Sequence, residues 1–349
     1  MRVLLCTTQV PFTRGGAELL AEELVKALRQ AGHDAEIVAI PFKWYPPERV
    51  PEHILACRLL DVTESSGIPV DLVIGLKFPA YFVRHPSKVL WILHQHRTAY
   101  DLWDNYPLGD LIHYPEGREV RDAIQHCDER FLPEARAIYT ISGNVSKRLK
   151  SFCGIDSRPL YHPPRNAGAF RAGDAGDYLS FPSRMNIPKR QELVLQALAK
   201  TRTPVKVTFS GRSDIPSYAE ELKLKTVNLG LADRVTWKGE TSDEMLVDLY
   251  AHCLGVVYPP IDEDYGYVTL EAMLASKPVI TCRDSGGALE FVAHGETGLC
   301  AEPAPEALAS AMDELWDDRA RAARMGQAGR ARYEALVPGW PEVVARLLG

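Results

Sequence analysis

Two glutamates, Glu263 and Glu271, mark the part of this sequence whose residue types suit the binding of a phosphorylated ligand. They stand eight positions apart within residues 254–292, LGVVYPPIDEDYGYVTLEAMLASKPVITCRDSGGALEFV. One predicted helix starts just after Gly266, and another starts just after the Ser-Gly-Gly turn at residues 285–287. A helix N-terminus favours an anion, because its first N–H groups have no intrahelical partner and its dipole is positive there. Two carboxylates beside two such helix ends could hold a phosphate and the hydroxyl-bearing groups attached to it.

The elements that would position these groups alternate along the stretch. The apolar residues 254–258 predict a strand, which two prolines end. A helix follows over residues 268–276, and Pro278 ends it because the residue before a proline disfavours the helical conformation. A strand at 279–282 and a helix from 288 to 293 complete a β-loop-α-β-loop-α order.

In these residues the stretch resembles the retaining glycosyltransferases of the GT-B fold, specifically the large family numbered four. The hallmark of that family is E-x7-E, then a short helix, Pro-Val-Ile, a Gly-Gly turn and a further Glu. The matching residues are Glu263, Gly266, Glu271, Pro278, Gly286, Gly287 and Glu290. Asp264 departs from the glycine that usually follows the first Glu. The resemblance implies an α/β protein of two Rossmann-like domains, each a doubly wound parallel sheet, facing each other across a cleft.

The alternation of strands and helices already begins at Tyr178, well before this stretch. Such a pattern argues for a parallel, doubly wound sheet. Five distinctive residues each follow the end of a predicted strand: Arg184, Gly211, Gly239, Glu263 and Gly286. Ligands of open α/β sheets bind at the carboxyl ends of the strands, so the sequence predicts one ligand site at this edge.

Arg184 and Lys189 place two cations five positions apart in the loop after one of these strands. The resembling family carries an Arg and a Lys at this spacing, where they bind the diphosphate of the donor. The alternative is a pair of solvated surface charges. Arg190 replaces the glycine that usually follows the Lys.

The first half of the chain opens with a predicted strand at residues 3–6, a loop ending in Gly15 and Gly16, a helix, and a second strand at residues 33–40. The spacing G-x-G-x-x-G is absent, which argues against a nicotinamide dinucleotide site. The two glycines resemble a family turn that faces the donor phosphate across the cleft. The alternative is a plain glycine turn at a helix entry.

A polar cluster, His94-Gln95-His96-Arg97, follows another predicted strand. In the resembling family a histidine here lies near the transferred sugar; His94 is the better match and His96 the second choice, while a purely structural histidine is the alternative. The aromatic residues after the cluster are Tyr100, Trp103, Tyr106 and Tyr114. They could stack on an acceptor sugar or pack the loop, and we favour packing. The candidates on the acceptor side are His96, Arg97, Tyr100 and Trp103.

A boundary between domains is predicted at residues 165–177, which are rich in Gly and Ala and lack periodicity. We expect an acceptor-binding domain of residues 1–164 with the C-terminal helix 335–349, and a nucleotide-sugar-binding domain of residues 165–334. Within the first, Ser142 is a plausible N-cap for a helix that begins near Val145.

Bulk properties exclude several other classes of protein. The net charge of −6 gives no electrostatic support for nucleic-acid binding. The seven cysteines are scattered without a C-x-x-C pair, which indicates reduced thiols and a cytoplasmic protein. No apolar run reaches the length of a membrane span, and the first apolar run is too short for a signal peptide. Weak peripheral contact with the inner face of a membrane stays open.

The resemblance implies transfer of a sugar, with retained configuration, from a UDP-, GDP- or other nucleotide sugar. The acceptor would be a glycan, a lipid-linked sugar or a small molecule, in surface polysaccharide or glycoconjugate synthesis. The expected catalytic residues are His94, Arg184, Lys189 and Glu263. The expected donor-binding residues are Gly15, Gly16, Gly211, Gly239, Gly266, Glu271, Ser285, Gly286 and Gly287. The alternatives are a glycosidase, a nucleotide-sugar epimerase of the same fold, and a non-catalytic nucleotide-sugar-binding protein.

The triplet Asp262-Glu263-Asp264 spells D-x-D, an acidic signature with which other glycosyltransferases hold a divalent cation. Carboxylates and phosphates are the oxygen ligands that Mg²⁺ prefers. Two cations and two helix ends are nevertheless available for the same phosphate charge, so a metal would duplicate them. We therefore expect no metal site and no cofactor.

Overall fold

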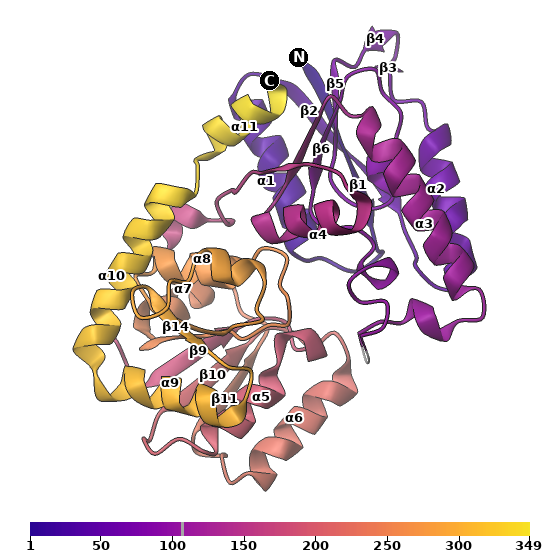
Figure 1. Cartoon of the computed structure of the whole chain (residues 1–349). Helices are drawn as coiled ribbons and strands as arrows, with labels where there is room; N and C mark the ends of the chain where they lie inside the picture. The colour runs from indigo at the N-terminus through magenta and orange to yellow at the C-terminus, as the bar shows by residue number, and fades with distance from the viewer. Residues whose placement is uncertain (106–107) are drawn as a thin grey trace. The chain divides into compact units, whose positions relative to one another are not determined.

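The structure is a computed structural model that describes residues 1–105 and 108–349 (Figure 1). The chain divides into two compact units. Unit 1 comprises Met1–Arg165 and Pro338–Gly349, and unit 2 comprises Asn166–Val337. Each contains a six-stranded sheet in which neighbouring strands run parallel. This confirms the predicted α/β class with two Rossmann-like sheets.

Unit 1 is built on a sheet with the spatial order β2-β1-β5-β6-β7-β8. These strands are β1 (Arg2–Gln9), β2 (Asp34–Pro41), β5 (Leu72–Gly75), β6 (Lys88–Ile92), β7 (Ala137–Thr140) and β8 (Arg158–Pro159). The helices are α1 (Gly16–Gln30), α2 (Val50–Leu59), α3 (Gly117–Phe131), α4 (Gly143–Cys153) and α11 (Trp340–Leu348). A separate hairpin joins β3 (Glu64–Ser65) to β4 (Ile68–Pro69). Helix α4 begins as predicted, because Ser142 Oγ accepts a hydrogen bond from the N–H of Val145 at 3.1 Å.

Unit 2 has the spatial order β11-β10-β9-β12-β13-β14. Its strands are β9 (Tyr178–Pro182), β10 (Lys206–Ser210), β11 (Val235–Gly239), β12 (Gly255–Val257), β13 (Val279–Cys282) and β14 (Gly298–Ala301). Its helices are α5 (Gln191–Leu198), α6 (Pro216–Asn228), α7 (Asp243–His252), α8 (Tyr267–Leu274), α9 (Pro305–Asp317) and α10 (Arg319–Leu336). Helix α5 packs on α9, and α8 packs on α10.

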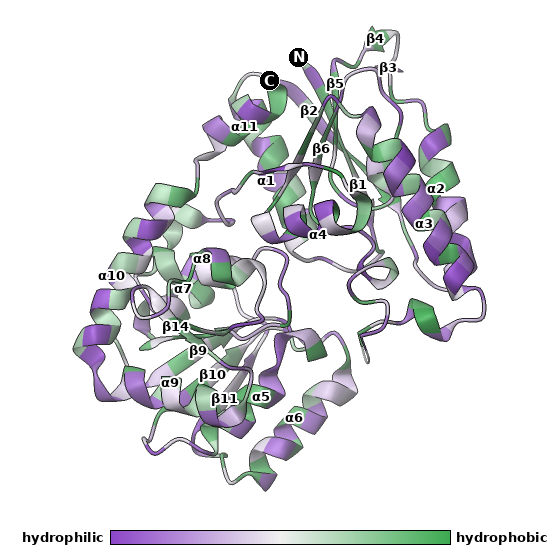
Figure 2. Ribbon diagram, in the orientation of Figure 1, coloured by the Kyte–Doolittle hydropathy of each residue, from purple (hydrophilic) through white to green (hydrophobic). Residues whose placement is uncertain are grey.

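The burial of the strands explains why these residues form the centre of each unit. Strand β12 and strand β13 are buried along their whole length, as continuous apolar runs of a parallel sheet should be. In Figure 2 the strands of both sheets are mostly hydrophobic, whereas the helices around them carry hydrophilic and hydrophobic residues. The last helix, α11, belongs to unit 1, where the Trp340 ring packs edge-on against Trp91 of β6.

Each sheet has one point where the order of its strands reverses. In unit 2 the chain builds β9, β10 and β11 outward in one direction and then β12, β13 and β14 in the other. Strands β9 and β12 are therefore neighbours whose following loops diverge, and such a topological switch point is where open α/β sheets bind ligands. In unit 1 the corresponding neighbours are β1 and β5.

One predicted element differs. The helix expected from residue 288 is a short 3-10 turn, Gly287–Glu290. The turn does not continue into an α-helix because the N–H of Ala293 donates to Thr297 Oγ1 at 2.9 Å instead of to a carbonyl one turn earlier. The anion-binding helix end predicted after residues 285–287 is therefore reduced to this turn.

Among the residues that the structure describes, there is no helix with both the length and the apolar character needed to cross a membrane.

Candidate functional site

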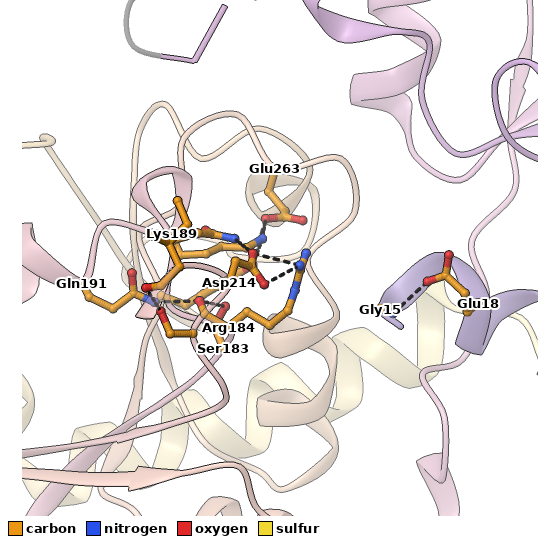
Figure 3. A network of polar contacts seen from close by, with 12 residues as sticks. Gly15, Glu18, Ser183, Arg184, Lys189, Gln191, Asp214 and Glu263 are labelled. Carbon is orange, nitrogen blue, oxygen red and sulfur yellow. Dashed lines mark hydrogen bonds and ion pairs between the residues drawn. The ribbon is translucent and has the colours of Figure 1, made fainter. Parts of the chain in front are cut away.

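A lysine and a glutamate meet across the switch point of unit 2. Lys189 lies in the loop after β9 and Glu263 in the loop after β12, and Lys189 Nζ forms an ion pair with Glu263 Oε2 (Figure 3). The Tyr258 hydroxyl joins both: it accepts from Lys189 Nζ at 2.9 Å and donates to Glu263 Oε2 at 2.9 Å. Only 16% of the Lys189 side chain and 20% of the Glu263 side chain are exposed. Two predicted catalytic residues are thus brought together by the fold.

Arg184 extends this cluster toward β10. Its Nη1 donates to both carboxylate oxygens of Asp214, at 3.0 and 2.9 Å, and the amide of Asn186 donates to the same carboxylate at 2.8 Å. The Arg184 side chain is 42% exposed, so the guanidinium is oriented by Asp214 and still open to solvent. A cation held in this way can receive an anionic ligand with little reorganisation.

Backbone hydrogen bonds tie together the three loops that follow β9, β12 and β13. From N–H to carbonyl they join Ile261 to Pro188 (2.7 Å), Asp262 to Asp284 (2.9 Å), Glu263 to Ser285 (3.3 Å) and Gly287 to Glu263 (2.7 Å). Glu263 therefore sits in a loop that is bonded on both sides. We call the segments 184–190, 261–266 and 284–287 the three site loops.

Two of the predicted glycines are required where loops touch. A Cβ on Gly211 would lie 2.3 Å from the carbonyl oxygen of Ser183, and the φ of +126° also favours glycine. A Cβ on Gly287 would lie 2.6 Å from the carbonyl oxygen of Asp264. Both glycines thus permit close contact between loops. The other predicted glycines of unit 2, at the same sheet edge, are Gly239 at the end of β11, Gly266 as the N-cap of α8, and Gly286 before the 3-10 turn.

Ser285 is fully buried, and its Oγ accepts a hydrogen bond from the N–H of Cys282 at 3.2 Å. Its side chain therefore stabilises the turn that follows β13.

Glu271 lies one turn into α8, where it is held by a buried tyrosine. The hydroxyl of Tyr250, in α7, donates to Glu271 Oε2 at 2.6 Å. Burial raises the pKa of Glu271 to about 7, and the hydrogen bond from Tyr250 opposes that rise. The carboxyl group is thus poised to change its charge near neutral pH.

The predicted histidines of unit 1 follow β6. His94 is partly buried, and its Nδ1 lies 2.7 Å from the carbonyl oxygen of Gln95. The His96 ring packs edge-on against Phe78, with ring centroids 5.0 Å apart, and against Phe42. Burial lowers the pKa of His96 to about 4, so this ring is neutral at pH 7. The His96 ring thus sits in an aromatic environment within unit 1.

Below these histidines lies a buried polar cluster around Asp128 of α3. Its carboxylate accepts hydrogen bonds from Tyr81 (2.8 Å), Tyr100 (2.7 Å) and the Gln95 amide (3.3 Å), and Asp128 has no exposed surface. Burial raises the pKa of Asp128 to about 6, against the effect of these hydrogen bonds. Gln95 stands between the two histidines, so the cluster anchors their loop to α3.

The other acceptor-side candidates have partners within unit 1. Tyr100 is 3% exposed with its hydroxyl on Asp128, so its side chain fits the packing alternative. The guanidinium of Arg121 lies over the Trp103 ring at 4.5 Å, and Arg97 forms an ion pair with Asp101 at 2.6 Å. Tyr114 is 40% exposed, and Tyr106 lies outside the described residues.

Gly15 and Gly16 stand at the switch point of unit 1. Gly15 is the N-cap of α1, Gly16 is the first residue of that helix, and the N–H of Gly15 donates to Glu18 Oε2 at 2.7 Å. Glu18 Oε1 in turn lies 3.6 Å from Nζ of Lys77, which follows β5. A second Lys–Glu pair therefore spans this switch point.

Within residues 1–105 and 108–349, no three His, Cys, Asp or Glu side chains form a group that could hold a metal ion.

Comparison with known proteins decides the family. The sequence model described as "Glycosyl transferases group 1" matches residues 170–332, which lie within unit 2. The chain is also 32% identical over 292 residues to alpha-1,3/1,6-mannosyltransferase ALG2 of Dictyostelium discoideum, covering 77% of this chain and 69% of the relative. The chain belongs to the group 1 glycosyltransferases.

A relative of similar length agrees with this assignment. O-antigen chain mannosyltransferase C of Escherichia coli is 23% identical over 372 residues, covering 96% of this chain and 94% of its own. As a group 1 glycosyltransferase the protein is a transferase enzyme.

Solved structures show that the fold is that of the GT-B glycosyltransferases. Sucrose-phosphate synthase of Thermosynechococcus elongatus aligns with a TM-score of 0.79 at 19% identity, covering 99% of this chain and 96% of its own. Anabaena HepE in complex with UDP and glucose aligns with a TM-score of 0.72 at 18% identity, covering 100% and 98%.

Sequence reasoning missed the partners that orient the charged groups of this glycosyltransferase: Asp214, Tyr258, Tyr250 and Asp128. Asp214, Tyr250 and Asp128 are distant in sequence from the residues they bond, so the neighbouring sequence carries no sign of them. Tyr258 lies only five residues before Glu263, but no pattern there shows that its hydroxyl bonds the glutamate. The position of Asp214 just after β10 was a usable signal, because β10 ends at the edge where the site was expected.

Proposed function

We propose that this glycosyltransferase transfers a sugar from a nucleotide-diphosphate sugar to an acceptor hydroxyl with retention of configuration at the anomeric carbon. The observation that carries the proposal is the cluster of Arg184, Lys189 and Glu263 at the switch point of unit 2. The UDP complex of the HepE structure supports a nucleotide donor for this fold.

Each group of the cluster, together with Glu271 of α8, has a role in the proposed reaction. Glu271 accepts hydrogen bonds from the ribose hydroxyls, and Glu263 orients the donor sugar. During transfer the bond between the anomeric carbon and the diphosphate oxygen breaks, and the acceptor oxygen forms a new bond to that carbon. The proton of the acceptor hydroxyl passes to the departing diphosphate oxygen. Arg184 and Lys189 stabilise the negative charge that develops on the departing diphosphate, because preorganised cations need no reorganisation at that moment.

In the proposed reaction Lys189 would bind the donor diphosphate in addition to its present partners. Its ammonium group pairs with Glu263 and donates to Tyr258. A diphosphate would share the lysine with Glu263, whose carboxylate would then turn toward the hydroxyls of the sugar. The Tyr258 hydroxyl would stay bonded to Glu263 during this change.

Unit 1 is proposed to bind the acceptor, with His94 near the transferred sugar and Gly15-Gly16 near the donor phosphate. The two mannosyltransferases that resemble the chain favour a mannosyl donor and a glycan or lipid-linked acceptor, in the synthesis of a surface polysaccharide or glycoconjugate. We propose that transfer occurs in the cytoplasm, with weak contact to the inner face of the membrane, and without a divalent metal ion.

The test is incubation of the purified protein with UDP- and GDP-sugars, with and without glycan and lipid-linked acceptors, in the presence of a chelator. We expect release of nucleoside diphosphate that depends on the acceptor, and a product with the anomeric configuration of the donor by NMR. Conversion of the donor to an epimer without release would establish an epimerase. Binding without any conversion would indicate a non-catalytic binding protein. Activity lost with chelator and restored by Mg²⁺ would implicate Asp262 and Asp264 as ligands.

A further inference from the structure

Arg190 has a backbone conformation that suits glycine better than arginine. Its φ and ψ of +60° and +40° lie in the left-handed region, where a Cβ crowds the backbone of an L-residue. Arg190 directly follows Lys189 and ends the first of the three site loops. A long charged side chain at such a position calls for an interaction that compensates the conformational cost.

That interaction is a two-pronged ion pair with the third site loop. Arg190 Nη1 donates to Asp284 Oδ1 at 2.8 Å, and Nη2 donates to Asp284 Oδ2 at 2.5 Å. The Arg190 side chain is 17% exposed and that of Asp284 is 41% exposed. Exposed ion pairs usually contribute little, but a planar guanidinium that meets a carboxylate with two parallel hydrogen bonds is both stronger and directional.

The Arg190–Asp284 pair adds a side-chain link to the backbone hydrogen bonds that connect the three site loops. Arg190 is adjacent to Lys189, and Asp284 is adjacent to the turn at 285–287. The main chain of Asp284 also accepts the N–H of Asp262, and that of Ser285 accepts the N–H of Glu263. The loops after β9 and β13 are thus joined to each other by side chains and to the Glu263 loop by backbone.

We propose that Arg190 and Asp284 form a clasp that positions Lys189 and the 285–287 turn on either side of Glu263. Both are positioning residues, because their side chains bind each other. The inference rests on the proposed function, and it adds two residues to the donor site. Loss of the clasp would leave the loops folded but allow Lys189 to shift, and small displacements of a reacting group can cost up to about 100-fold in rate.

Arg190→Gly separates positioning from folding, since glycine accepts the left-handed backbone without strain. We expect Arg190→Gly and Asp284→Asn each to melt close to the wild-type temperature while kcat falls about 10- to 100-fold and donor KM changes less. The double variant should be no slower than the slower single variant. The exchanged pair Arg190→Asp with Asp284→Arg should recover part of kcat, because Asp also tolerates this backbone conformation.

Arg283→Ala is the matched control. Arg283 is adjacent to Asp284 but forms its ion pair with Glu302 at 2.9 Å, and its side chain is 59% exposed. We expect this variant to retain full turnover. Normal turnover of Arg190→Gly would overturn the clasp. So would a normal Asp284→Asn beside an impaired Arg190→Gly, since that result would make Arg190 a direct ligand of the donor.

Hydrogen–deuterium exchange provides a readout that does not depend on activity. In Arg190→Gly we expect faster exchange in peptides that cover 284–287, with unchanged exchange in unit 1. Unchanged exchange in the peptides that cover 284–287 would overturn the clasp even if the wild type transferred no sugar. Absence of transfer by the wild type with every donor would instead refute the proposed function, so the two failures are distinct.

Discussion

The two units place a lysine and a glutamate at the same topological position and use them differently. In unit 2, Lys189 and Glu263 lie in loops and share the Tyr258 hydroxyl, with Arg184 on the same loop as Lys189. In unit 1, Glu18 belongs to the first turn of α1 and accepts the N–H of Gly15, so its pair with Lys77 completes a helix cap. At the equivalent edge of the sheet, unit 2 thus has a cluster of charged side chains in its loops, whereas unit 1 has a capped helix.

A second difference concerns where the polar groups are buried. Unit 2 presents charges at the ends of its strands, whereas the main polar cluster of unit 1 lies beneath the histidine loop, around the fully buried Asp128. The family model matches residues within unit 2 alone. We infer that unit 2 carries the donor chemistry, and that unit 1 uses its polar cluster to hold the loop of His94.

The largest expected effect comes from removing the lysine of the unit 2 cluster. Lys189→Ala should lower turnover at saturating donor by about 10²–10³-fold, the loss typical for one group that stabilises developing charge. Lys77→Ala removes the corresponding lysine of unit 1 and should leave turnover within a few-fold of wild type. Initial rates at saturating donor and acceptor measure both. Equal losses for the two variants would contradict the division of roles between the units.

Glu271→Ala should weaken donor binding by about 1.5–3 kcal/mol, the usual contribution of a hydrogen bond to a charged group. Isothermal calorimetry with the nucleotide sugar measures the loss, and circular dichroism checks the fold. Glu290→Ala, in the adjacent 3-10 turn, serves as a comparison for a nearby carboxylate. Unchanged affinity of Glu271→Ala would remove this residue from the site.

The pKa of Glu271 predicts a pH dependence of binding. The charged carboxylate is the form that accepts hydrogen bonds from ribose hydroxyls, and with a pKa of about 7 this form grows from a minority at pH 6 to a majority at pH 8. Donor affinity should therefore rise roughly tenfold over this range, since one pH unit below the pKa leaves about a tenth of the group charged. A nucleotide sugar is the right probe, because its diphosphate has no ionisation near neutral pH. The rise should disappear in Glu271→Gln; an identical rise in that variant would assign it to another group.

The smallest expected effect concerns the buried polar cluster of unit 1. At pH 4, Asp128→Asn should reduce the free energy of unfolding by about 1 kcal/mol, since one of the three hydrogen bonds to the carboxyl group is weakened. The pKa of Asp128 is raised from 3.8 to about 6 in the folded protein, so the folded state binds more protons than the unfolded state between these values. The stability advantage of the wild type over the variant should hence shrink as pH rises from 4 to 6. Urea unfolding at several pH values measures it, and a difference that grows with pH would contradict the assignment.

The sheet edge that carries the candidate site could be predicted from the sequence, whereas most of the contacts within this site could not. Glycines and prolines mark the strand ends, and in a parallel sheet all those ends meet at one edge, so Arg184, Gly211, Gly239 and Gly286 could be placed there. The contacts that these residues make with their partners could not be predicted in the same way. Asp214, for example, approaches Arg184 because β9 and β10 are neighbours, which depends on the strand order and not on local pattern.

Two further features, the turn at residues 288–293 and the role of Tyr100, could not be decided from the local sequence. Residues 288–293 read as a helix because no breaker interrupts them, yet the hydroxyl of Thr297 captures the N–H of Ala293. Tyr100 read as either a sugar platform or a packing residue, and only the position of Asp128 on α3 shows that its hydroxyl is bound in the interior. The first contact is made by a side chain four residues away and the second by one 28 residues away, and neither is marked by a pattern in the sequence.

We propose that the loops after β9, β12 and β13 of unit 2 bind the nucleotide sugar. Hydrogen–deuterium exchange of the wild-type protein, with saturating UDP- or GDP-sugar and with chelator present, tests this proposal. We expect slower exchange in peptides covering 184–190, 261–271 and 284–287, and much weaker protection in Lys189→Ala at the same donor concentration. Protection confined to unit 1, or protection of these loops that is unchanged in Lys189→Ala, would contradict it.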